Sequence, residues 1–231
     1  MDATDHGHAK ILQRITAIFQ HRAPMCGRNQ DRDTLRNEEA LAMRRSSGVL
    51  ITALLGASLA VAQNAGTLRE PDVPYVPTTD TAVKAMLQLA RVKRTDVVYD
   101  LGCGDGRIII AAAKNYGARG VGIDIDPVRI REAKKNARQA GVENRVEFRE
   151  QDLFQSDFRE ATVVTLFLLP AINRRLRPQL EALKPGTRIV SNTFEIGDWK
   201  PARELFVKDD ANDEYYFGSR RVLLWIVPER K

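Results

Sequence analysis

A glycine-rich turn between two apolar segments limits the folds open to this chain more than any other feature. An apolar run that begins at Val97 ends in the acidic residue Asp100, and glycines follow at positions 102, 104 and 106. A second apolar segment then begins at Ile108. Glycine permits a sharp backbone turn and lets a ligand approach without meeting a Cβ. The order strand, glycine turn, helix is that of the first half of a nucleotide-binding βαβ unit.

The spacing of these glycines discriminates between ligands. A dinucleotide-binding Gly-x-Gly-x-x-Gly that starts at Gly102 needs a glycine at position 107, but the chain has Arg107 there and its third glycine comes earlier, at Gly106. Asp100 lies just before the turn, where a carboxylate would repel a pyrophosphate and would suit a ligand with a cationic amino group. The alternative is a Rossmann-like domain that binds NAD or no nucleotide.

Strand-like and helix-like segments alternate from residue 96 to about residue 195. This pattern predicts an α/β fold: a Rossmann-like, doubly wound, seven-stranded sheet with an antiparallel hairpin at its C-terminal edge. Asp80 is expected to cap a first helix that runs to about Val92, and Pro178 is expected to break or kink a later one. The expected strands are 97–100, 120–124, 145–149, 161–167, 187–194, 204–208 and 221–227, and the other expected helices begin at 108, 127 and 171.

Acidic residues follow three successive expected strands: Asp100, Asp124 and Asp152. Ligands in such sheets bind at the carboxyl ends of the strands, so these side chains should meet in one site. Asp124 comes 24 residues after Asp100 (124 − 100), about where such folds place the acid that binds ribose hydroxyls. For Asp152 a role as a helix cap or turn residue is the alternative.

The run Asp100-Leu-Gly-Cys-Gly-Asp-Gly106 resembles the first motif of class I S-adenosylmethionine (SAM) methyltransferases. The resemblance implies SAM as the cofactor, with Asp100 organising the turn and the methionine amino group. It further implies that Asp124 accepts from the ribose hydroxyls and that Asp152 accepts from the adenine amino group. The other expected cofactor-binding residues are Gly102, Cys103, Gly104, Gly106, Ile125 and Leu153.

A wider set of motifs narrows the resemblance. The chain carries, in this order, Pro74-Tyr-Val-Pro-Thr78, the glycine turn, Leu168-Leu-Pro170, Lys184-Pro-Gly186 and Gly197-Asp-Trp199. The set is similar to the protein-lysine methyltransferase family that includes the mitochondrial enzymes modifying the adenine nucleotide translocase and the ATP synthase c-subunit, together with bacterial relatives. It covers about residues 71 to 200 and implies a protein substrate, which in this family can be a membrane protein. The expected acceptor-pocket residues are Tyr75, Thr78, Leu169, Asn173 and Asn192.

Several kinds of chemistry are disfavoured by residues that the chain lacks. Its three histidines are at positions 6, 8 and 21, and neither of its two cysteines has a metal-binding spacing. Histidine-dependent catalysis and a metal are therefore not expected. The fourth expected strand ends in Thr165-Leu-Phe-Leu-Leu-Pro170 instead of the Asn/Asp-Pro-Pro-Tyr/Phe motif of many amide and nucleobase methyltransferases, which argues against adenine-N6 and glutamine acceptors. Methyl transfer itself requires mainly positioning and desolvation.

The N-terminal part is expected to be a separate region. Residues 1–42 form a polar leader, which is not translated if Met43 is the true start. Residues 43–62 contain Arg44-Arg45 and a charge-free run of 15 residues, Gly48 to Ala62, which is typical of a signal peptide or a membrane anchor. Residues 63–79 would be a connector and 80–231 the methyltransferase domain. We therefore expect a membrane-anchored or exported, periplasmic protein, with membrane association through 46–63; a cytoplasmic protein is the alternative.

The charge distribution bears on the partner. The net charge is +6, and basic and acidic residues are interspersed without a basic, aromatic stripe, so no nucleic-acid partner is expected. The sequence favours transfer of a methyl group from SAM to a lysine of a protein. Two alternatives stay open: a small-molecule methyltransferase, and a non-catalytic exported SAM-binding protein. The signal-peptide-like segment 43–62 favours the non-catalytic exported alternative, because SAM is made in the cytoplasm.

Overall fold

The computed structural model describes residues 75–208 and 219–229, all within a compact unit that begins at Leu68. The expected leader 1–42, the segment 43–62 and most of the connector 63–79 lie outside the described residues. Among the helices of the described part of the chain, none combines the length and the hydropathy that a membrane span requires.

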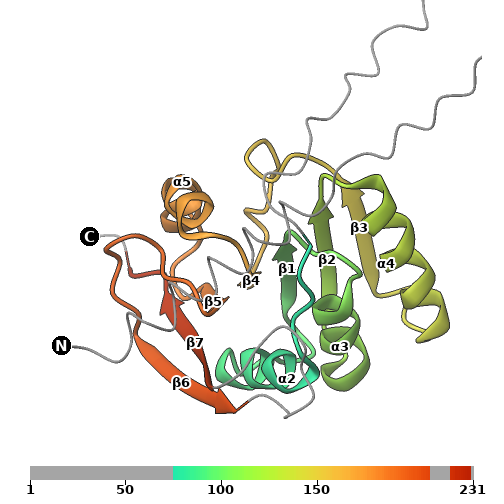
Figure 1. Cartoon of the computed structure of the whole chain (residues 1–231), viewed down its shortest axis with the longest axis horizontal. Helices are drawn as coiled ribbons and strands as arrows, with labels where there is room; N and C mark the ends of the chain where they lie inside the picture. Colours follow the sequence, from blue (N-terminus) through green and yellow to red (C-terminus); the bar gives the residue numbers. More distant parts are fainter. Residues whose placement is uncertain (1–74, 209–218, 230–231) are drawn as a thin grey trace, which may run out of the picture. The chain divides into compact units, whose positions relative to one another are not determined.

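The elements follow the alternation that the sequence predicts. In chain order they are α2 (Asp80–Leu89), β1 (Val97–Leu101), α3 (Arg107–Tyr116), β2 (Arg119–Asp124), α4 (Pro127–Gln139), β3 (Val146–Glu150), β4 (Val163–Leu166), α5 (Pro170–Glu181), β5 (Arg188–Asn192), β6 (Arg203–Lys208) and β7 (Ser219–Ile226). The strands form one seven-stranded sheet in the order β3-β2-β1-β4-β5-β7-β6 (Figure 1). This confirms the expected α/β fold.

The direction of strand pairing explains where a site can form. Strands β1 to β5 pair in parallel, whereas β7 runs antiparallel between β5 and the edge strand β6. The antiparallel C-terminal hairpin is thus confirmed. The strand order reverses between β1 and β4, so the connections after these two strands leave to opposite sides and open a crevice at their carboxyl ends.

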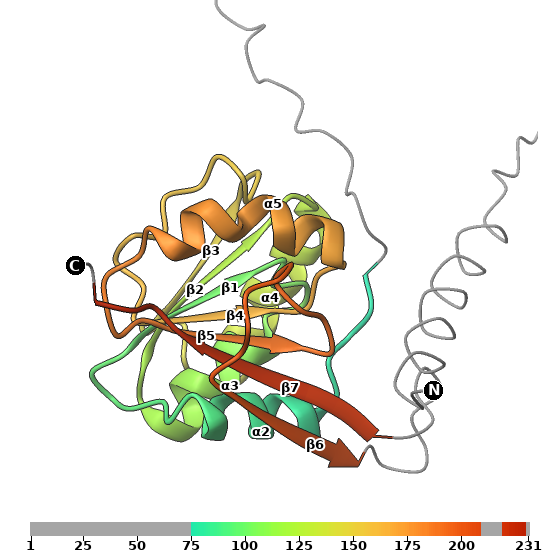
Figure 2. The same ribbon diagram turned by 90° about the vertical axis from the view of Figure 1, so that its left-hand side faces the viewer.

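Two apolar layers hold helices against the two faces of the sheet. On one face α2, α3 and α4 pack on Val98, Val163 and Val190. On the other face α5 and the 151–161 connection pack on Leu166, Trp225 and their neighbours. Figure 2 shows α5 on one side of the strands and α2 and α3 on the other. The central strands are apolar on both faces because both faces are buried.

Three details of the helices differ from the expectation. The cap of α2 is Thr79, whose hydroxyl accepts from the Ala82 N–H at 3.3 Å, and Asp80 is the first helical residue. The helix ends at Leu89, before Val92, because Arg91 adopts a left-handed conformation with φ of 50°. Pro178 does not break α5, which is continuous to Glu181; the proline lies on the exposed side of the helix, where solvent can bond the backbone carbonyl that the proline cannot.

A buried ion pair ties the sheet together at the amino ends of its strands. Asp96, 6% exposed, accepts from Arg188 Nη2 at 2.5 Å, Thr162 Oγ1 at 2.8 Å and Lys93 N–H at 2.6 Å. Arg188 also donates to the Ala90 carbonyl at 2.8 Å, so one network joins β1 and β5 to the end of α2. Burial opposes ionisation, but the hydrogen bonds from Arg188, Lys93 and Thr162 lower the pKa of Asp96 below its ordinary value.

Replacing Asp96 by alanine should lower the free energy of unfolding by about 3 kcal/mol, because the Arg188 guanidinium stays partly buried without its acid. The stability that ionised Asp96 contributes is fully present above its unfolded-state pKa of about 4. This stability is lost as the pH falls through the lower pKa of the folded state. Urea unfolding near neutral pH measures the change. Asp157→Ala is the matched control, since Asp157 pairs with Arg159 at the exposed surface and should leave the midpoint unchanged. Equal midpoints for the two variants would contradict this role of Asp96.

Candidate functional site

Asp100 is a buried carboxylate at the end of β1. It is 3% exposed, and its Oδ1 accepts from Thr165 Oγ1 of β4 at 2.7 Å. Burial raises the pKa of Asp100 to about 7, against the lowering effect of the Thr165 hydrogen bond; the nearby charges of Asp124 and Asp105 raise it further. Within the described residues no cation pairs with it. A buried carboxylate of this kind is suited to a cationic ligand.

Asp124, at the end of β2, holds the glycine turn in place. Its Oδ2 accepts from the Gly104 N–H at 2.8 Å and its Oδ1 from the Asp126 N–H at 2.9 Å. Burial raises the pKa of Asp124, while these two backbone hydrogen bonds lower it. Each carboxylate oxygen has a second lone pair, so Asp124 can also accept from a ligand's hydroxyls.

The backbone of the turn is closed by its own hydrogen bonds. The N–H groups of Gly102 and Cys103 both donate to the Ile123 carbonyl, at 2.8 and 3.0 Å. The Gly104 N–H donates to Asp124. All three N–H groups thus have partners within the protein and are not free to donate to a ligand. Backbone contacts from Gly102, Cys103 and Gly104 to a ligand would therefore come from their carbonyl oxygens and Cα surfaces.

Each glycine of the turn has a positive φ, but their surroundings differ. A Cβ on Gly104 would lie 2.3 Å from the Tyr75 ring, and one on Gly102 would lie 2.8 Å from Leu168 Cδ2. A Cβ on Gly106 would instead meet Phe148 at 2.7 Å, on the side where α4 and β3 pack. Glycine at 106 is thus required by packing, and its expected contact with the cofactor stays a prediction.

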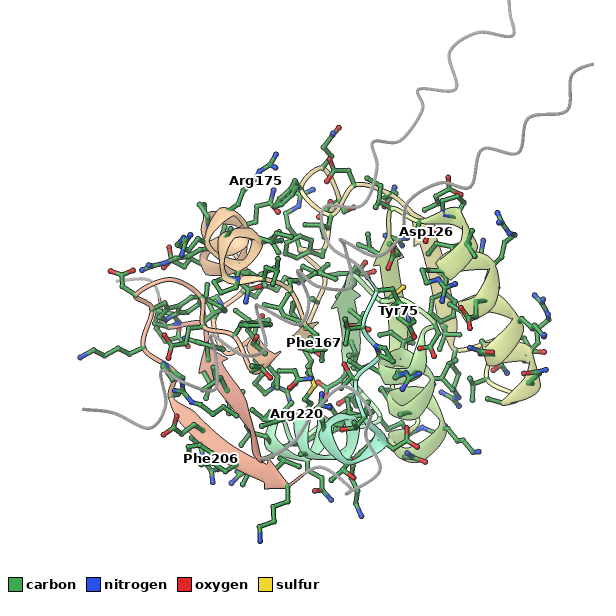
Figure 3. The ribbon with its side chains drawn as sticks, viewed as in Figure 1. Tyr75, Asp126, Phe167, Arg175, Phe206 and Arg220 are labelled. Carbon is green, nitrogen blue, oxygen red and sulfur yellow. The ribbon has the colours of Figure 1, made fainter. Side chains whose placement is uncertain are left out.

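A contact that the sequence pattern does not predict brings Tyr75 and Thr78 to the turn. Asp105 forms a bidentate pair with Arg107, whose Nη1 donates to the Thr78 carbonyl at 2.7 Å. Partial burial and the charge of Asp105 raise the pKa of Tyr75 to about 12. The Arg129 guanidinium lies 4.7 Å from the centroid of the Tyr75 ring. Figure 3 labels Tyr75. The only sequence signal for these contacts of Asp105 and Arg107 is the position of Asp105 inside the glycine turn.

The connection after β4 supplies an apolar wall on the other side of the turn. Leu168 packs on Gly102, and the rings of Phe167 and Phe194 stack with centroids 6.1 Å apart. Leu169 is partly buried, and its carbonyl accepts the Asn173 N–H at 3.1 Å as α5 begins. The expected acceptor residues Leu169, Asn173 and Asn192 thus lie around the ends of β4 and β5.

Four of the expected cofactor residues have structural roles as well. Asp152 sits in a turn, where its Oδ1 accepts from the Phe154 N–H at 2.9 Å, so the alternative role as a turn residue is realised. Cys103 is 5% exposed, and burial raises the pKa of its thiol, so the side chain belongs to the core. Leu153 packs against the α5 layer, and Ile125 is half-buried beyond β2. Contacts of these four residues with the cofactor stay predictions.

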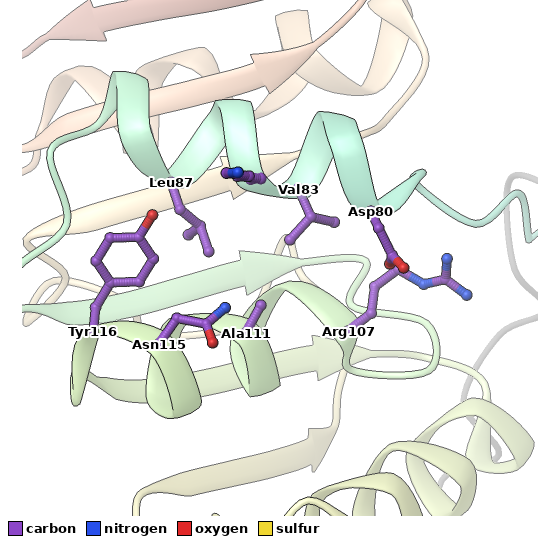
Figure 4. A pocket seen from close by; sticks show the side chains of 8 residues that line it. Asp80, Val83, Leu87, Arg107, Ala111, Asn115 and Tyr116 are labelled. Atoms are coloured by element: carbon purple, nitrogen blue, oxygen red, sulfur yellow. The ribbon is translucent and has the colours of Figure 1, made fainter. Parts of the chain in front are cut away.

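A separate pocket of about 480 Å³ lies between α2 and α3 (Figure 4). Val83, Leu87 and Ala111 form its apolar part, with Lys84 and Arg107 among its charged residues. Among the predicted cofactor and acceptor residues, none lines it. The pocket therefore does not coincide with the strand ends where the candidate site lies.

Comparison with known proteins identifies the family. A profile of the ANTKMT methyltransferase domain matches residues 100–203. A protein-lysine N-methyltransferase from Saccharolobus islandicus is 47% identical over 163 residues, which cover 70% of this chain and 98% of that protein. The chain belongs to this methyltransferase family. The lysine N-methyltransferase of the ATP synthase c-subunit from Xenopus laevis is 32% identical, and the match covers 68% of this chain and 72% of that one.

A solved structure is also similar to this methyltransferase. It is described as an RNA methyltransferase from Salinibacter ruber in complex with S-adenosyl-L-homocysteine, with 51% identity and a TM-score of 0.61. The match covers 68% of this chain and 96% of that one. This likeness supports the fold and a SAM-dependent reaction, as the resemblance in the sequence implied.

The site of the methyltransferase fits SAM by the chemistry of its donors. SAM carries an ammonium group, a positively charged sulfonium that supplies the methyl group, and ribose hydroxyls. The buried Asp100 carboxylate, which pairs with no cation in the described structure, suits the ammonium. Asp124 retains lone pairs for the hydroxyls. Leu168 and Tyr75 pack directly on Gly102 and Gly104, so these two side chains border the turn at which the cofactor is expected.

Gly104→Ala should weaken SAM binding at least about tenfold, because the new Cβ would displace the Tyr75 ring from the turn. Gly141→Ala is the matched control. Gly141 also has a positive φ, of 69°, but a Cβ there meets nothing within 4 Å. Both variants should lose about 1 kcal/mol of stability from the left-handed conformation, and only Gly104→Ala should lose SAM affinity. Calorimetric titration with equal affinities for the two would contradict the placement of Tyr75.

Proposed function

We propose that this SAM-dependent methyltransferase transfers the methyl group to the ε-amino group of a lysine in a protein substrate. The similarity to a protein-lysine N-methyltransferase at 47% identity carries the proposal, because it extends over 98% of that relative. A match of this extent leaves little of that enzyme without a counterpart in this chain.

The geometry supports an amine acceptor. The methyl carbon is attacked by a lone pair, so the lysine must first lose its proton. Phe167, Phe194 and Leu168 make the surroundings of the acceptor side apolar, and desolvation lowers the pKa of a lysine by disfavouring its charged form. Transfer then needs alignment more than an acid–base residue. The residues of this chain thus position the amine and exclude water.

RNA is the second candidate acceptor, because the similar Salinibacter ruber structure is described as an RNA methyltransferase. Many arginines of the described domain are paired with acids: Arg107 with Asp105, Arg149 with Glu147 and Arg221 with Glu204. Such pairing leaves less positive charge for phosphates. It favours a protein acceptor over a nucleic acid.

Tritiated SAM and extracts of the source cell distinguish these acceptors. The full chain should place the label in material that is destroyed by protease and resistant to ribonuclease. Label that is destroyed by ribonuclease would establish the RNA candidate. Label that passes an ultrafiltration membrane would establish a small-molecule acceptor. Either of the last two results would contradict the proposal.

We further propose that residues 43–62 bring the enzyme to a membrane, where membrane proteins are among its substrates. The support is the charge-free run from Gly48 to Ala62, which lies outside the described residues. Fractionation of source cells tests this. The enzyme should sediment with membranes at high salt, and recovery of all of it in the soluble cytoplasmic fraction would contradict the proposal.

A further inference from the structure

The side chain of Asn192 at the end of β5 is fully buried and incompletely bonded. Its Oδ1 accepts from Thr193 Oγ1 at 3.1 Å, whereas its Nδ2 has no hydrogen-bond partner among the described residues. Asn173 of α5 is also fully buried; its Nδ2 donates to the Glu195 carbonyl at 3.2 Å, and its Oδ1 has no hydrogen-bond partner among the described residues. A buried polar atom without a partner is unfavourable, and a ligand that bonds to it would remove this cost.

The strand register places Asn192 beside the cofactor turn. Leu101 of β1 pairs with Leu166 of β4, and Leu166 pairs with Ser191 of β5. The next residues along these three parallel strands, Gly102, Phe167 and Asn192, therefore lie level. Adjacent strands are about 4.8 Å apart, so Asn192 is about 10 Å from Gly102 across the sheet.

The side chain of Asn192 faces the same side of the sheet as the Asp100 carboxylate. Asp100 pairs with Thr165, and Thr165 pairs with Val190, so their side chains share one face. Asn192 is two residues beyond Val190 and faces the same way. Two charged residues of neighbouring strands share this face: Asp100 of β1 and the buried Arg220 of β7. Figure 3 labels Arg220. On α2 the buried residues are apolar.

The turn after β5 is built to hold this side chain. Thr193 has a φ of 69°, a strained conformation for a β-branched residue. It is held there by a hydrogen bond from its N–H to the Arg221 carbonyl at 2.6 Å, and Ser191 Oγ donates to the Phe194 carbonyl at 2.6 Å. Strain of this kind persists where the surrounding structure imposes it, and it is common at functional sites.

We propose that the Asn192 amide accepts a hydrogen bond from the neutral ε-amine of the acceptor lysine and so aims the amine lone pair at the methyl carbon. The proposal rests on the lysine methylation proposed above. A rotation of the amide by 180° lets Nδ2 donate to the Thr193 hydroxyl, which accepts as well as donates, and turns Oδ1 towards the acceptor.

The step is a displacement in which atoms and charges balance. The amine nitrogen forms a bond to the methyl carbon while the carbon–sulfur bond breaks, and the electron pair of that bond stays on sulfur. The methylated nitrogen is then positively charged and releases one proton to solvent. Asn192 gains or loses no proton in this step; it binds and orients the acceptor.

Asn192→Asp tests the proposal, because the replacement has the same shape but carries a negative charge. The carboxylate should stabilise the ammonium form of the lysine and raise its pKa. With tritiated SAM and source-cell extract as the acceptor, the rate near neutral pH should fall at least about tenfold and its pH midpoint should rise by about one unit. The SAM dissociation constant should change by less than about threefold.

A second variant distinguishes a loss of activity from a loss of folding. Asn192→Ala removes the unpartnered atom together with the hydrogen bond to Thr193, so the two effects on stability oppose each other and the melting temperature should change by less than about 5 °C, while the rate should still fall at least about tenfold. Ser191→Ala is the matched control from the same turn: it should lower the melting temperature and leave the pH midpoint in place.

Three results would overturn the inference. An unchanged pH midpoint in Asn192→Asp would show that the amide does not contact the amine. Loss of SAM affinity in either Asn192 variant would assign the amide to the cofactor. If the wild-type chain labels no protein at all, the proposed function fails and the inference fails with it, which distinguishes that result from the other two.

Discussion

Asp100→Asn is expected to stabilise the free protein at pH 8 by about 1–3 kcal/mol while weakening SAM binding at least about tenfold. The folded protein holds a proton on Asp100 up to about pH 7, because burial raises the pKa of this carboxyl well above its ordinary value. The stability it contributes is therefore fully present below the unfolded-state pKa, near 4, and is lost as the pH rises through about 7. Asparagine cannot ionise and avoids this loss.

The same substitution should remove a pH dependence from SAM binding. A cationic ligand binds the ionised form of Asp100, so the affinity of the wild-type protein should fall as the pH drops below about 7, by up to about tenfold per pH unit. Titration calorimetry between about pH 5.5 and about pH 8.5 measures this slope. Asp100→Asn should show a flat profile.

Thr165→Val provides the matched control for Asp100. It removes the hydroxyl that donates to the Asp100 carboxylate at 2.7 Å and keeps the shape of the side chain. The pKa of Asp100 should then rise further, which moves the pH dependence of SAM binding upward without abolishing it. A wild-type affinity that is constant over the whole pH range would contradict the assignment of Asp100 to the ammonium group.

Asp124→Ala is expected to weaken SAM binding by about 1.5–3 kcal/mol, or roughly 10- to 150-fold, from the lost hydrogen bonds to a charged acceptor. The glycine turn is also affected, because the Gly104 N–H loses its acceptor at 2.8 Å. The free protein should therefore lose stability as well as affinity. Calorimetry and thermal unfolding measure the two effects separately.

Asp126→Ala is the matched control for Asp124. Asp126 caps α4 by accepting the Val128 N–H at 2.7 Å, and it lies two residues beyond Asp124 in the chain. Its removal should lower stability by about 1 kcal/mol and leave SAM affinity within about threefold. Equal losses of affinity in the two variants would mean that Asp124 acts only through the local fold.

The sequence predicted the fold and the main acids of the site because both depend on local patterns. The apolar runs that end in Asp100 and Asp124 mark β1 and β2, and the glycines mark the turn between strand and helix. Buried parallel strands are apolar throughout, so the apolar runs showed how many strands the sheet has. The last two runs follow each other without a helix between them, which predicted the antiparallel hairpin at the C-terminus.

The rest of the site depends on contacts between distant residues, which leave no periodic signal. Thr165 reaches Asp100 from 65 positions along the chain, and Arg107 reaches the Thr78 carbonyl from 29. The cap of α2 differed by one residue because Thr79 and Asp80 are both good capping residues. Asn192 is fully buried, and the next residue, Thr193, is strained. Both features result from packing between distant residues, which the sequence pattern does not show.

The central claim is transfer of a methyl group to lysine, and analysis of the labelled amino acid tests it most directly. The full chain is incubated with tritiated SAM and source-cell extract, the protein is hydrolysed in acid, and the label is identified by chromatography against methyl-lysine standards. Asp124→Ala serves as the control with weakened SAM binding. We predict that the label elutes as methylated lysine and is lost in the variant. Label in any other amino acid, or a label that the variant produces equally well, would contradict the account.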